Sequence, residues 1–365
     1  MNSSYLHPEF IRRCFELAKK GELHVTPNPQ VGCVIVKDGR IIAEGYHKQF
    51  GKAHAEIEAL RIAGERGRGA TMYVNLEPCS HFGKTPPCAD AIIKAGISKV
   101  VASIADPNPQ ISGRGFQRLR KAGIAVETGI LAEEATRLNE RFVYYMKKRK
   151  PFVGIKVAQT LDGLIADVRR RSQWITSPGA RQEAHRLRAI YESVLIGAGT
   201  AIKDNPELTV RLVKGRNPTR IVVDGRLRCP PNLKLFDTRH AKTIVLTSRS
   251  AFHRKKALVQ QLERKGVSVI TAGASPQLSV TAIQTKLSTL GISSVLIEGG
   301  GETVSRFLEK PVANKIHVFV APKILGGGLT SFSLRNPRIL TKALTLNGVE
   351  VRCVGDDVLV EGYFR

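Results

Sequence analysis

Hydrophobic positions in the first part of the chain alternate between two spacings. Apolar residues recur every three or four positions in some segments, which predicts helices within residues 8–21, 54–67, 88–97 and 113–123. Short runs rich in β-branched residues lie between them and predict strands within residues 31–46, 69–76, 98–106 and 123–130. Strands that alternate with helices are typical of an α/β fold.

The same alternation returns after a joint near residue 148. A helical pattern over residues 132–150 ends in the basic cluster Lys147–Lys150, which we interpret as a charged linker rather than a nuclear signal, and Pro151 follows it. We therefore expect two α/β domains, at residues 1–147 and 148–365. The second has a predicted helix at residues 178–190 and predicted strands at residues 152–159, 193–199, 219–225, 243–248, 267–272, 294–300 and 316–322.

Length and composition agree with a globular protein of two domains. The chain has 365 residues, of which 42% are hydrophobic and 24% charged. It contains no uninterrupted apolar run of membrane-spanning length, and its first twenty residues mix acids and bases without an apolar signal core. Six cysteines are too few for a disulfide scaffold. We expect a cytoplasmic protein that does not use a membrane.

The formal net charge of +26 is distributed unevenly. Lysine and arginine exceed aspartate and glutamate by 5 in residues 1–146 and by 21 in residues 147–365. Such a field attracts nucleic acid, an acidic membrane or a phosphorylated small molecule, and it also serves as a solubilising surface. Charge alone therefore does not select a partner.

One histidine, one glutamate and two cysteines predict a catalytic zinc site. The segment HAE at residues 54–56 is followed by EPC at residues 77–79 and by a second Pro-Cys pair that ends at Cys88. His54, Cys79 and Cys88 would be the three protein ligands of a zinc ion whose fourth position binds water. Zinc lowers the pKa of a bound water from about 15.7 to about 7, and Glu56 would carry protons to the leaving group. Zinc deaminases of nucleobases have this arrangement.

The spacing of the two cysteines departs from the usual short form. Eight residues, SHFGKTPP, separate Cys79 from Cys88 instead of two. Two buried thiols beside a core histidine, or a closed structural zinc with His81 as fourth ligand, are the alternatives.

A glycine-rich segment in the second domain predicts a phosphate site. Residues 293–308, SSVLIEGGGETVSRFL, have the pattern of a buried strand, three glycines and a helix start, where free backbone N–H groups can bind a phosphate. The segment is not G-x-G-x-x-G, and a plain tight turn is the alternative.

Longer segments resemble a known family. Residues 26–47, 54–60 and 75–97 closely resemble the deaminase half of the bifunctional riboflavin biosynthesis enzymes, in which the long cysteine spacing is usual. Residues 156–166, 172–189, 196–211 and 297–308 resemble their reductase half, and together the resemblance covers nearly the whole chain. It implies a cytidine-deaminase-like zinc domain followed by a dihydrofolate-reductase-like domain that uses NADPH. The implied reactions are deamination of a diaminopyrimidinone ribosyl phosphate and reduction of its ribosyl group to a ribityl chain.

The resemblance also implies binding residues. Those for the deaminase substrate would be Asn28, His81 and Lys84. Those for the cofactor would be Ala158, Trp174, Thr176, Thr200, Asp204, Gly300, Gly301, Glu302, Thr303, Val304, Ser305 and Arg306. Those for the reductase substrate would be Ser172, Arg188, Leu208, Arg211 and Glu298.

Three points in this assignment stay open. Trp174, the only tryptophan, is alternatively a core anchor. Asn205 stands where an acid is expected in many relatives, while Asp204 is present. Glu298 and Lys156 are the candidates for a general acid in the reductase site.

Two other functions remain as alternatives. The first is a zinc deaminase of tRNA or single-stranded DNA with a basic binding domain, but an aromatic content of 6% provides few stacking platforms for bases. The second is a non-catalytic module that binds NADPH or RNA and has a structural zinc. We favour a small phosphorylated pyrimidine as the partner over nucleic acid, and the sequence leaves the oligomeric state open, a homo-oligomer included.

Overall fold

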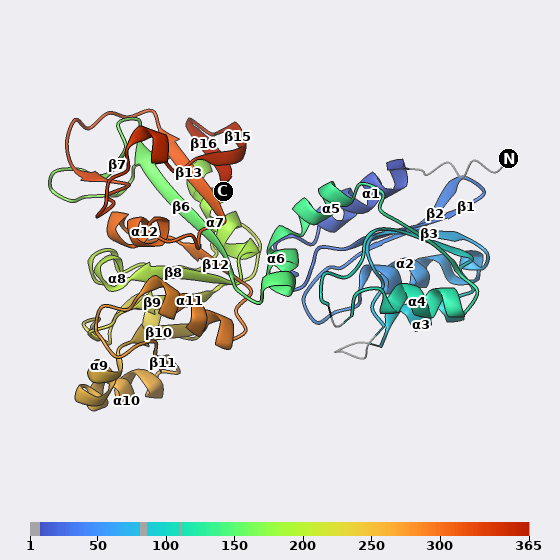
Figure 1. Ribbon diagram of the computed structural model, residues 1–365, viewed down its shortest axis with the longest axis horizontal. Helices are drawn as coiled ribbons and strands as arrows, with labels where there is room; N and C mark the ends of the chain where they lie inside the picture. Colours follow the sequence, from blue (N-terminus) through green and yellow to red (C-terminus); the bar gives the residue numbers. More distant parts are fainter. Residues whose placement is uncertain (1–7, 81–85, 110, 365) are drawn as a thin grey trace. The chain divides into compact units, whose positions relative to one another are not determined.

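The computed structural model describes residues 8–80, 86–109 and 111–364, and the chain divides into two compact units between Arg149 and Lys150 (Figure 1). The boundary expected from the sequence lies two residues earlier. Each unit is an α/β domain with one main sheet. No helix within the described residues is long and apolar enough to cross a membrane.

The first unit is built on a five-stranded sheet in the order β2-β1-β3-β4-β5. Strand β1 is antiparallel to β2 and β3, whereas β3, β4 and β5 are parallel to one another. The strands are β1 (Gly32–Lys37), β2 (Arg40–Tyr46), β3 (Thr71–Leu76), β4 (Lys99–Ile104) and β5 (Ala125–Thr128).

Helices cover both faces of this sheet. One core contains apolar side chains of α1 and α5, and the other contains those of α2, α3 and α4. The helices are α1 (Pro8–Lys19), α2 (Ala55–Ala63), α3 (Cys88–Lys94), α4 (Arg114–Lys121), α5 (Ala132–Leu138) and α6 (Glu140–Lys148), with a 3-10 turn η1 (Gly64–Gly67) after α2.

The single helix predicted over residues 132–150 is wrong, because the structure divides it at Asn139 into α5 and α6. The buried Asn139 side chain accepts a hydrogen bond from the Gln30 backbone N–H at 2.7 Å and donates one to the Gln30 carbonyl at 2.9 Å. These bonds to a distant loop hold Asn139 at φ −110°, outside helical geometry.

The second unit contains a nine-stranded sheet in the order β11-β10-β9-β8-β12-β6-β13-β16-β15. Its first seven strands are parallel, and the last two form an antiparallel hairpin. The strands are β6 (Phe152–Thr160), β8 (Ser193–Gly197), β9 (Thr219–Val223), β10 (Thr243–Thr247), β11 (Ser268–Thr271), β12 (Ser294–Ile297), β13 (Lys315–Ala321), β15 (Leu346–Val354) and β16 (Asp357–Phe364).

Two apolar cores pack helices onto this sheet. The helices are α7 (Pro178–Ile190), α8 (Ala198–Asp204), α9 (Arg249–Arg254), α10 (Lys256–Arg264), α11 (Val280–Thr289) and α12 (Gly301–Leu308), with 3-10 turns η2 (Lys234–Phe236) and η3 (Leu340–Lys342).

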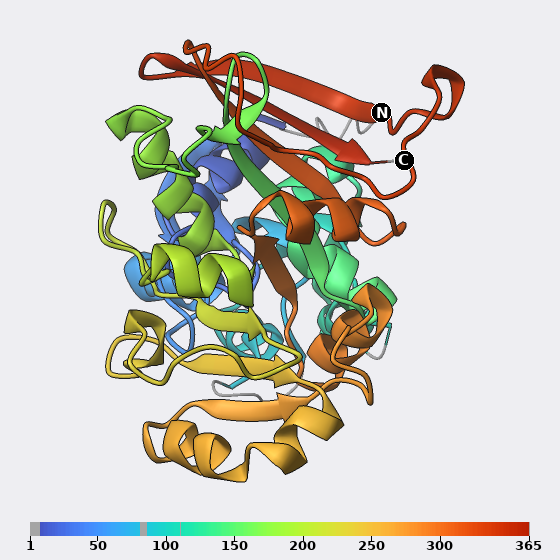
Figure 2. The same cartoon turned by 90° about the vertical axis from the view of Figure 1, so that its left-hand side faces the viewer.

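The sequence patterns identified all seven parallel strands but missed four others. Two of these, β7 (Leu164–Ala166) and β14 (Leu329–Thr330), pair as a small separate ribbon. The other two form the terminal hairpin, which is red in Figure 2. Strand β15 is exposed from Asn347 to Cys353, so it lacks the buried face on which pattern reading depends.

Candidate functional sites

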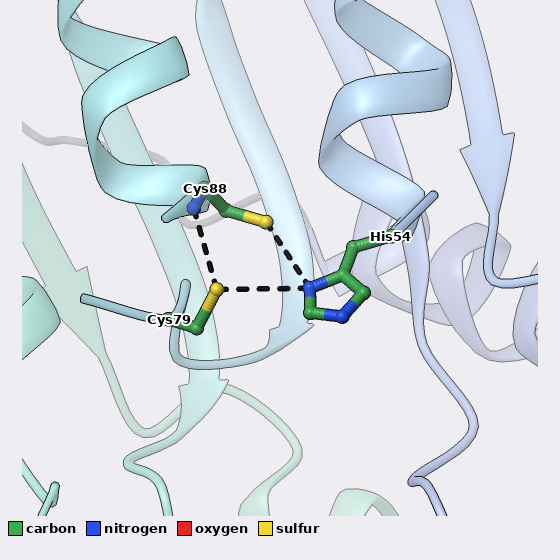
Figure 3. A group of neighbouring side chains, drawn as sticks. All are labelled: His54, Cys79 and Cys88. Carbon is green, nitrogen blue, oxygen red and sulfur yellow. Dashed lines mark hydrogen bonds between the residues drawn. The ribbon is translucent and has the colours of Figure 1, made fainter. Parts of the chain in front are cut away.

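Three different elements of the first unit bring the predicted zinc ligands together (Figure 3). His54 is the residue before α2, in extended conformation, and Cys88 is the first residue of α3 after Pro87. Cys79 lies in the loop that follows β3. The starts of two neighbouring helices and the end of a strand therefore meet at one point.

The donor atoms of these residues are close enough to hold one metal ion. His54 Nδ1 lies 3.3 Å from Cys88 Sγ and 3.6 Å from Cys79 Sγ, and the three donor atoms all lie within 4.8 Å of one another. One imidazole nitrogen and two sulfurs match the donor set of zinc with a position left for water. The group has no fourth His, Cys, Asp or Glu within the described residues, and His81 lies outside them.

Hydrogen bonding prepares one sulfur for metal binding. The hydrogen bond with Cys88 lowers the pKa of Cys79 well below its usual range, and the same bond together with burial raises the pKa of Cys88. The Cys88 backbone N–H also donates to Cys79 Sγ at 3.3 Å. Cys79 therefore loses its proton more readily than Cys88, and the thiolate is the form that binds a metal.

Glu56 has the environment of a proton-transfer group. It lies in the first turn of α2, only 3% of its surface is exposed, and its Oε2 atom has no hydrogen-bond partner. Burial raises its pKa above the ordinary value of 4.5. A buried carboxyl with a raised pKa and an oxygen without a hydrogen-bond partner is suited to taking up and releasing a proton.

Asn28 is held beside this group by His47, a residue that sequence reasoning missed. His47 Nδ1 lies 3.0 Å from the Ala53 carbonyl, which only accepts, so Nδ1 carries the proton. His47 Nε2 then accepts from Asn28 Nδ2 at 3.2 Å. The His47 ring also meets the His54 ring edge-on, with the centroids 5.4 Å apart. Lys84, the third expected substrate residue with Asn28 and His81, lies outside the described residues.

Glu77, which was also missed, fixes the loop that carries Cys79. Its buried carboxylate accepts hydrogen bonds from four backbone N–H groups, with N–O distances of 2.8 Å to 3.3 Å. A Cβ atom at Gly115, the second residue of α4, would lie 2.1 Å from the Pro78 carbonyl oxygen. The sequence contained a signal for His47 and Glu77, since each is a polar residue within two positions of a strand end. It did not show which groups they contact. The donors to Glu77 are the N–H groups of Asp106, Gly113, Gly115 and Phe116.

The second unit contains a cleft of about 1670 Å³. Residues at the carboxyl ends of the parallel strands β6, β8, β9 and β12 line it, which is where open α/β sheets bind ligands. All of the expected cofactor and reductase-substrate residues line the cleft except Ser305. Ser305 is buried, and its hydroxyl accepts a hydrogen bond from Ser333 N at 2.8 Å.

The glycine-rich turn lies in this cleft between β12 and α12. Gly300 is the residue before α12, and its N–H donates to Thr200 Oγ1 at 3.0 Å. A Cβ atom at Gly299 would lie 2.5 Å from Thr303 Cβ, and one at Gly301 would lie 2.6 Å from the Thr330 carbonyl oxygen. The turn therefore requires glycine for packing, and the N-terminal N–H groups of α12 suit a phosphate.

Trp174 is not a core anchor, because 65% of its surface is exposed. Its ring lines the cleft, and the Arg181 guanidinium stacks on it at 4.6 Å from the ring centroid. A flat ring held in this way is available to an aromatic ligand.

Asn205, which stands where an acid is expected, lies at the end of α8. Asn205 ends α8 in left-handed conformation at φ 41°, which asparagine tolerates better than most residues. Its Oδ1 accepts a hydrogen bond from Lys234 N at 2.8 Å. The neighbouring Asp204 lines the cleft, and burial raises its pKa.

A buried group of charges forms the inner wall of the cleft. Arg188 donates two hydrogen bonds to Glu298, at 2.6 Å and 2.8 Å. Burial alone would raise the pKa of Glu298, but Arg188 and Lys156 lower it, so Glu298 is ionised. Burial lowers the pKa of Lys156 below its ordinary value of 10.5.

Comparisons with known proteins match both units. Residues 4–104 match the family of the cytidine and deoxycytidylate deaminase zinc-binding region, and residues 151–360 match the RibD C-terminal domain. The chain is 43% identical to the riboflavin biosynthesis protein RibD of Aquifex aeolicus over 352 residues, which cover 96% of each chain.

Solved structures give the same result. RibD of Acinetobacter baumannii superimposes with a TM-score of 0.88 at 36% identity, covering 98% of both chains. A diaminohydroxyphosphoribosylaminopyrimidine deaminase/5-amino-6-(5-phosphoribosylamino)uracil reductase of Thermotoga maritima superimposes with a TM-score of 0.83 at 43% identity, again covering 98% of both chains.

Proposed function

The chain belongs to the RibD family of bifunctional riboflavin biosynthesis enzymes, and from this premise we propose how its residues carry out the two reactions. It is a zinc-dependent deaminase in its first unit and an NADPH-dependent reductase in its second. The alternative function, a nucleic-acid deaminase suggested by the positive charge of the second domain, is not favoured. We also propose residues 1–147 and 148–365 as the limits of the two domains.

His54, Cys79 and Cys88 hold the zinc ion of the deaminase. The observation that supports this most strongly is the convergence of their donor atoms within 4.8 Å, with no fourth protein ligand among the described residues. Zinc bound there supplies an activated water for attack on the pyrimidine carbon that bears the amine. Glu77 fixes the position of Cys79 through four backbone hydrogen bonds.

Glu56 moves the proton in this reaction. Its unpartnered Oε2 takes a proton from the attacking water and delivers it to the leaving amine, which departs as ammonia. His47 uses up one N–H of the Asn28 amide, which leaves the Asn28 Oδ1 atom for the pyrimidine. His81 and Lys84 are proposed to contact the substrate on the resemblance alone.

The cleft of the second unit binds NADPH and the deaminated product. The glycine turn and the N-terminus of α12 hold the pyrophosphate, and Trp174 lies against a ring of one of the ligands. Arg226 and Arg228, which follow β9 and line the cleft, are exposed cations suited to the 2′-phosphate. NADPH supplies the hydride that reduces the opened, imine-like sugar to the ribityl chain.

Lys156, rather than Glu298, donates the proton in the reduction. Glu298 is ionised and held by Arg188 through two hydrogen bonds, so it has no proton to give. Lys156 lines the same cleft, and its lowered pKa makes its ammonium a better acid. Glu298 and Arg188 instead bind and orient the substrate.

The partner proposed for the whole chain is this small phosphorylated pyrimidine, without nucleic acid. A cytoplasmic location is proposed because all six cysteines are free.

A direct assay tests the proposed function. The zinc-loaded chain is given the diaminopyrimidinone ribosyl phosphate and NADPH, and ammonia release and NADPH oxidation are followed together. Ammonia should appear first, and NADPH oxidation should follow with a lag. NADPH oxidation without ammonia, or ammonia release from nucleic acid instead, would contradict the proposal.

A further inference from the structure

His185 lines the cleft of the second unit but takes no part in the reactions proposed above. It belongs to α7 and lies three residues before Arg188, so the two side chains lie on the same face of the helix. Both residues line the cleft, and only 6% of the His185 surface is exposed. A buried imidazole needs a hydrogen-bond partner for each of its two ring nitrogens.

One ring nitrogen holds the loop that carries Arg211. The Arg211 backbone N–H donates to His185 Nδ1 at 2.8 Å, and Leu212 N lies 3.4 Å from the same atom. Because Nδ1 accepts a hydrogen bond, it has no proton, and Nε2 of the neutral ring carries one. Burial, followed by the charges of Arg188 and Arg211, lowers the pKa of His185 to about 4, so the ring is neutral at pH 7.

The other ring nitrogen carries a proton without an acceptor. His185 Nε2 lies 3.5 Å from Arg188 Nη1, but a guanidinium nitrogen only donates, so this contact brings two donors together. Among the described residues no acceptor atom forms a hydrogen bond with Nε2. Two neighbouring donors that cannot satisfy each other, on residues that line a ligand cleft, are suited to an oxygen atom of a ligand.

The surrounding side chains favour an anionic ligand. Arg188 donates to the Thr209 carbonyl at 3.3 Å, which ties α7 to the Arg211 loop at a second point. The Arg211 side chain is 49% exposed, and its hydrogen bonds within the described chain use Nη1 alone, which leaves Nε and Nη2 for a ligand. The neutral His185 ring adds a donor to these two arginines without adding a third positive charge.

We propose, on the basis of the reductase function proposed above, that His185 is a further substrate-binding residue of the reductase. Its Nδ1 fixes the Arg211 loop, and its Nε2–H, beside Arg188, donates to a phosphate oxygen of the deaminated ribosyl phosphate. The phosphates of NADPH are less suited to this position, because the glycine turn offers N–H groups to the pyrophosphate and the cations after β9 suit the 2′-phosphate.

Two substitutions separate the roles of the two ring nitrogens. His185→Asn keeps an acceptor near the position of Nδ1 and removes the Nε2 donor, whereas His185→Leu removes both. The reductase kcat/KM is measured with the deaminated ribosyl phosphate and with the same compound after phosphatase treatment, and the ratio of the two values gives the preference for phosphate. His185→Asn should lower this ratio at least about tenfold, because a hydrogen bond to a charged group is lost, and His185→Leu should lower it further.

His253→Asn is the matched control, since His253 is an exposed histidine on α9 of the same unit and is not among the residues that line the cleft. The ratio for this variant should equal that of the natural chain. Ammonia release, which belongs to the first unit, and the dissociation constant for NADPH should be the same in all of these chains, because the variants fold and the cofactor binds elsewhere in the cleft.

Three results would overturn the role of His185. They are an unchanged ratio in His185→Asn, equal losses of kcat/KM for the two compounds, and a weakened binding of NADPH. A natural chain that oxidises no NADPH with either compound would instead contradict the reductase function itself, and the role of His185 with it.

Discussion

Arg188 and Glu298 form a two-pronged ion pair inside the cleft of the second unit, with N–O distances of 2.6 Å and 2.8 Å. Although burial would raise the pKa of Glu298, Arg188 and Lys156 lower it below 4.5, so the carboxyl is ionised at neutral pH. This ionisation therefore separates the two residues that the sequence left as equal candidates for a general acid. In the proposed mechanism Glu298 positions the substrate and Lys156 donates the proton.

Substitution of Lys156 should affect the reductase alone. Lys156→Met should lower the reductase kcat by about 10²-fold to 10⁴-fold, because the proton donor is removed, and should leave ammonia release unchanged. In the natural enzyme the reductase rate should fall as the pH rises through the lowered pKa of Lys156, since its ammonium loses the proton, and the variant should lack this decline. A variant with a normal rate and the same alkaline decline would exclude Lys156.

Glu56 should be needed for proton transfer and not for zinc binding. Glu56→Gln should keep about one zinc per chain but lose deamination by about 10²-fold to 10⁴-fold. Zinc content by atomic absorption and ammonia release by a coupled assay measure the two effects. Loss of the metal would show instead that Glu56 is a ligand.

Each cysteine of the proposed site should be essential for the metal. Cys79→Ser or Cys88→Ser should bring the zinc content close to zero and abolish ammonia release, because only two of three ligands remain. Cys353→Ser is the control, since Cys353 is an exposed cysteine of the other unit. If either site variant retained full zinc, the ligand assignment would be wrong.

Discrimination between NADPH and NADH should depend on the cations after β9. Arg226→Ala and Arg228→Ala should each weaken NADPH binding by roughly one to two decades, the equivalent of about 1.5 to 3 kcal/mol for a charge-assisted contact, and should leave NADH binding nearly unchanged. Fluorescence titration measures both dissociation constants. Equal losses for the two dinucleotides would place the 2′-phosphate elsewhere.

The ionised carboxylate of Glu361 should stabilise the second unit at neutral pH and lose this effect in acid. Burial would raise its pKa, but the hydrogen bond and charge of His317, with Lys315 and Arg352, lower it from 4.5 to about 2. Because the folded pKa is below the unfolded one, the stabilisation is complete above about pH 4.5 and is lost as the pH falls toward 2. Glu361→Gln should therefore cost on the order of 3 kcal/mol or less at pH 7, and less at pH 3. Thermal midpoints at both pH values, with Asp356→Asn as control, measure this difference.

The sequence predicted those features that depend on residue type and local spacing. The parallel strands have continuous apolar runs, and the zinc ligands are recognisable because few residue types bind zinc. Features that depend on distant contacts were not predictable in this way. The break at Asn139 comes from hydrogen bonds to Gln30, more than a hundred residues earlier in the chain. His47 and Glu77 likewise act through backbone groups that only the fold brings near them.

The resemblance to relatives supplied positions but not orientations. It placed Ser305 among the cofactor residues, whereas Ser305 is not among the residues that line the cleft and its hydroxyl accepts a hydrogen bond from Ser333 N. It left open whether Trp174 lies in the core or in the cleft, and the 65% exposure of this residue excludes the core. It also did not reveal that Arg188 and Glu298 bind each other, because neither spacing nor composition shows which side chains meet.

The claim that one chain carries two separate active sites is tested most directly by mixing two variants. Glu56→Gln and Lys156→Met are each supplied with the diaminopyrimidinone ribosyl phosphate and NADPH, alone and together, while ammonia and oxidised NADPH are measured. Glu56→Gln alone should yield neither product, and Lys156→Met alone should yield ammonia only. The mixture should yield both, because the intermediate made by one variant is reduced by the other. A Lys156→Met variant that releases no ammonia, or a mixture that oxidises no NADPH, would contradict the account.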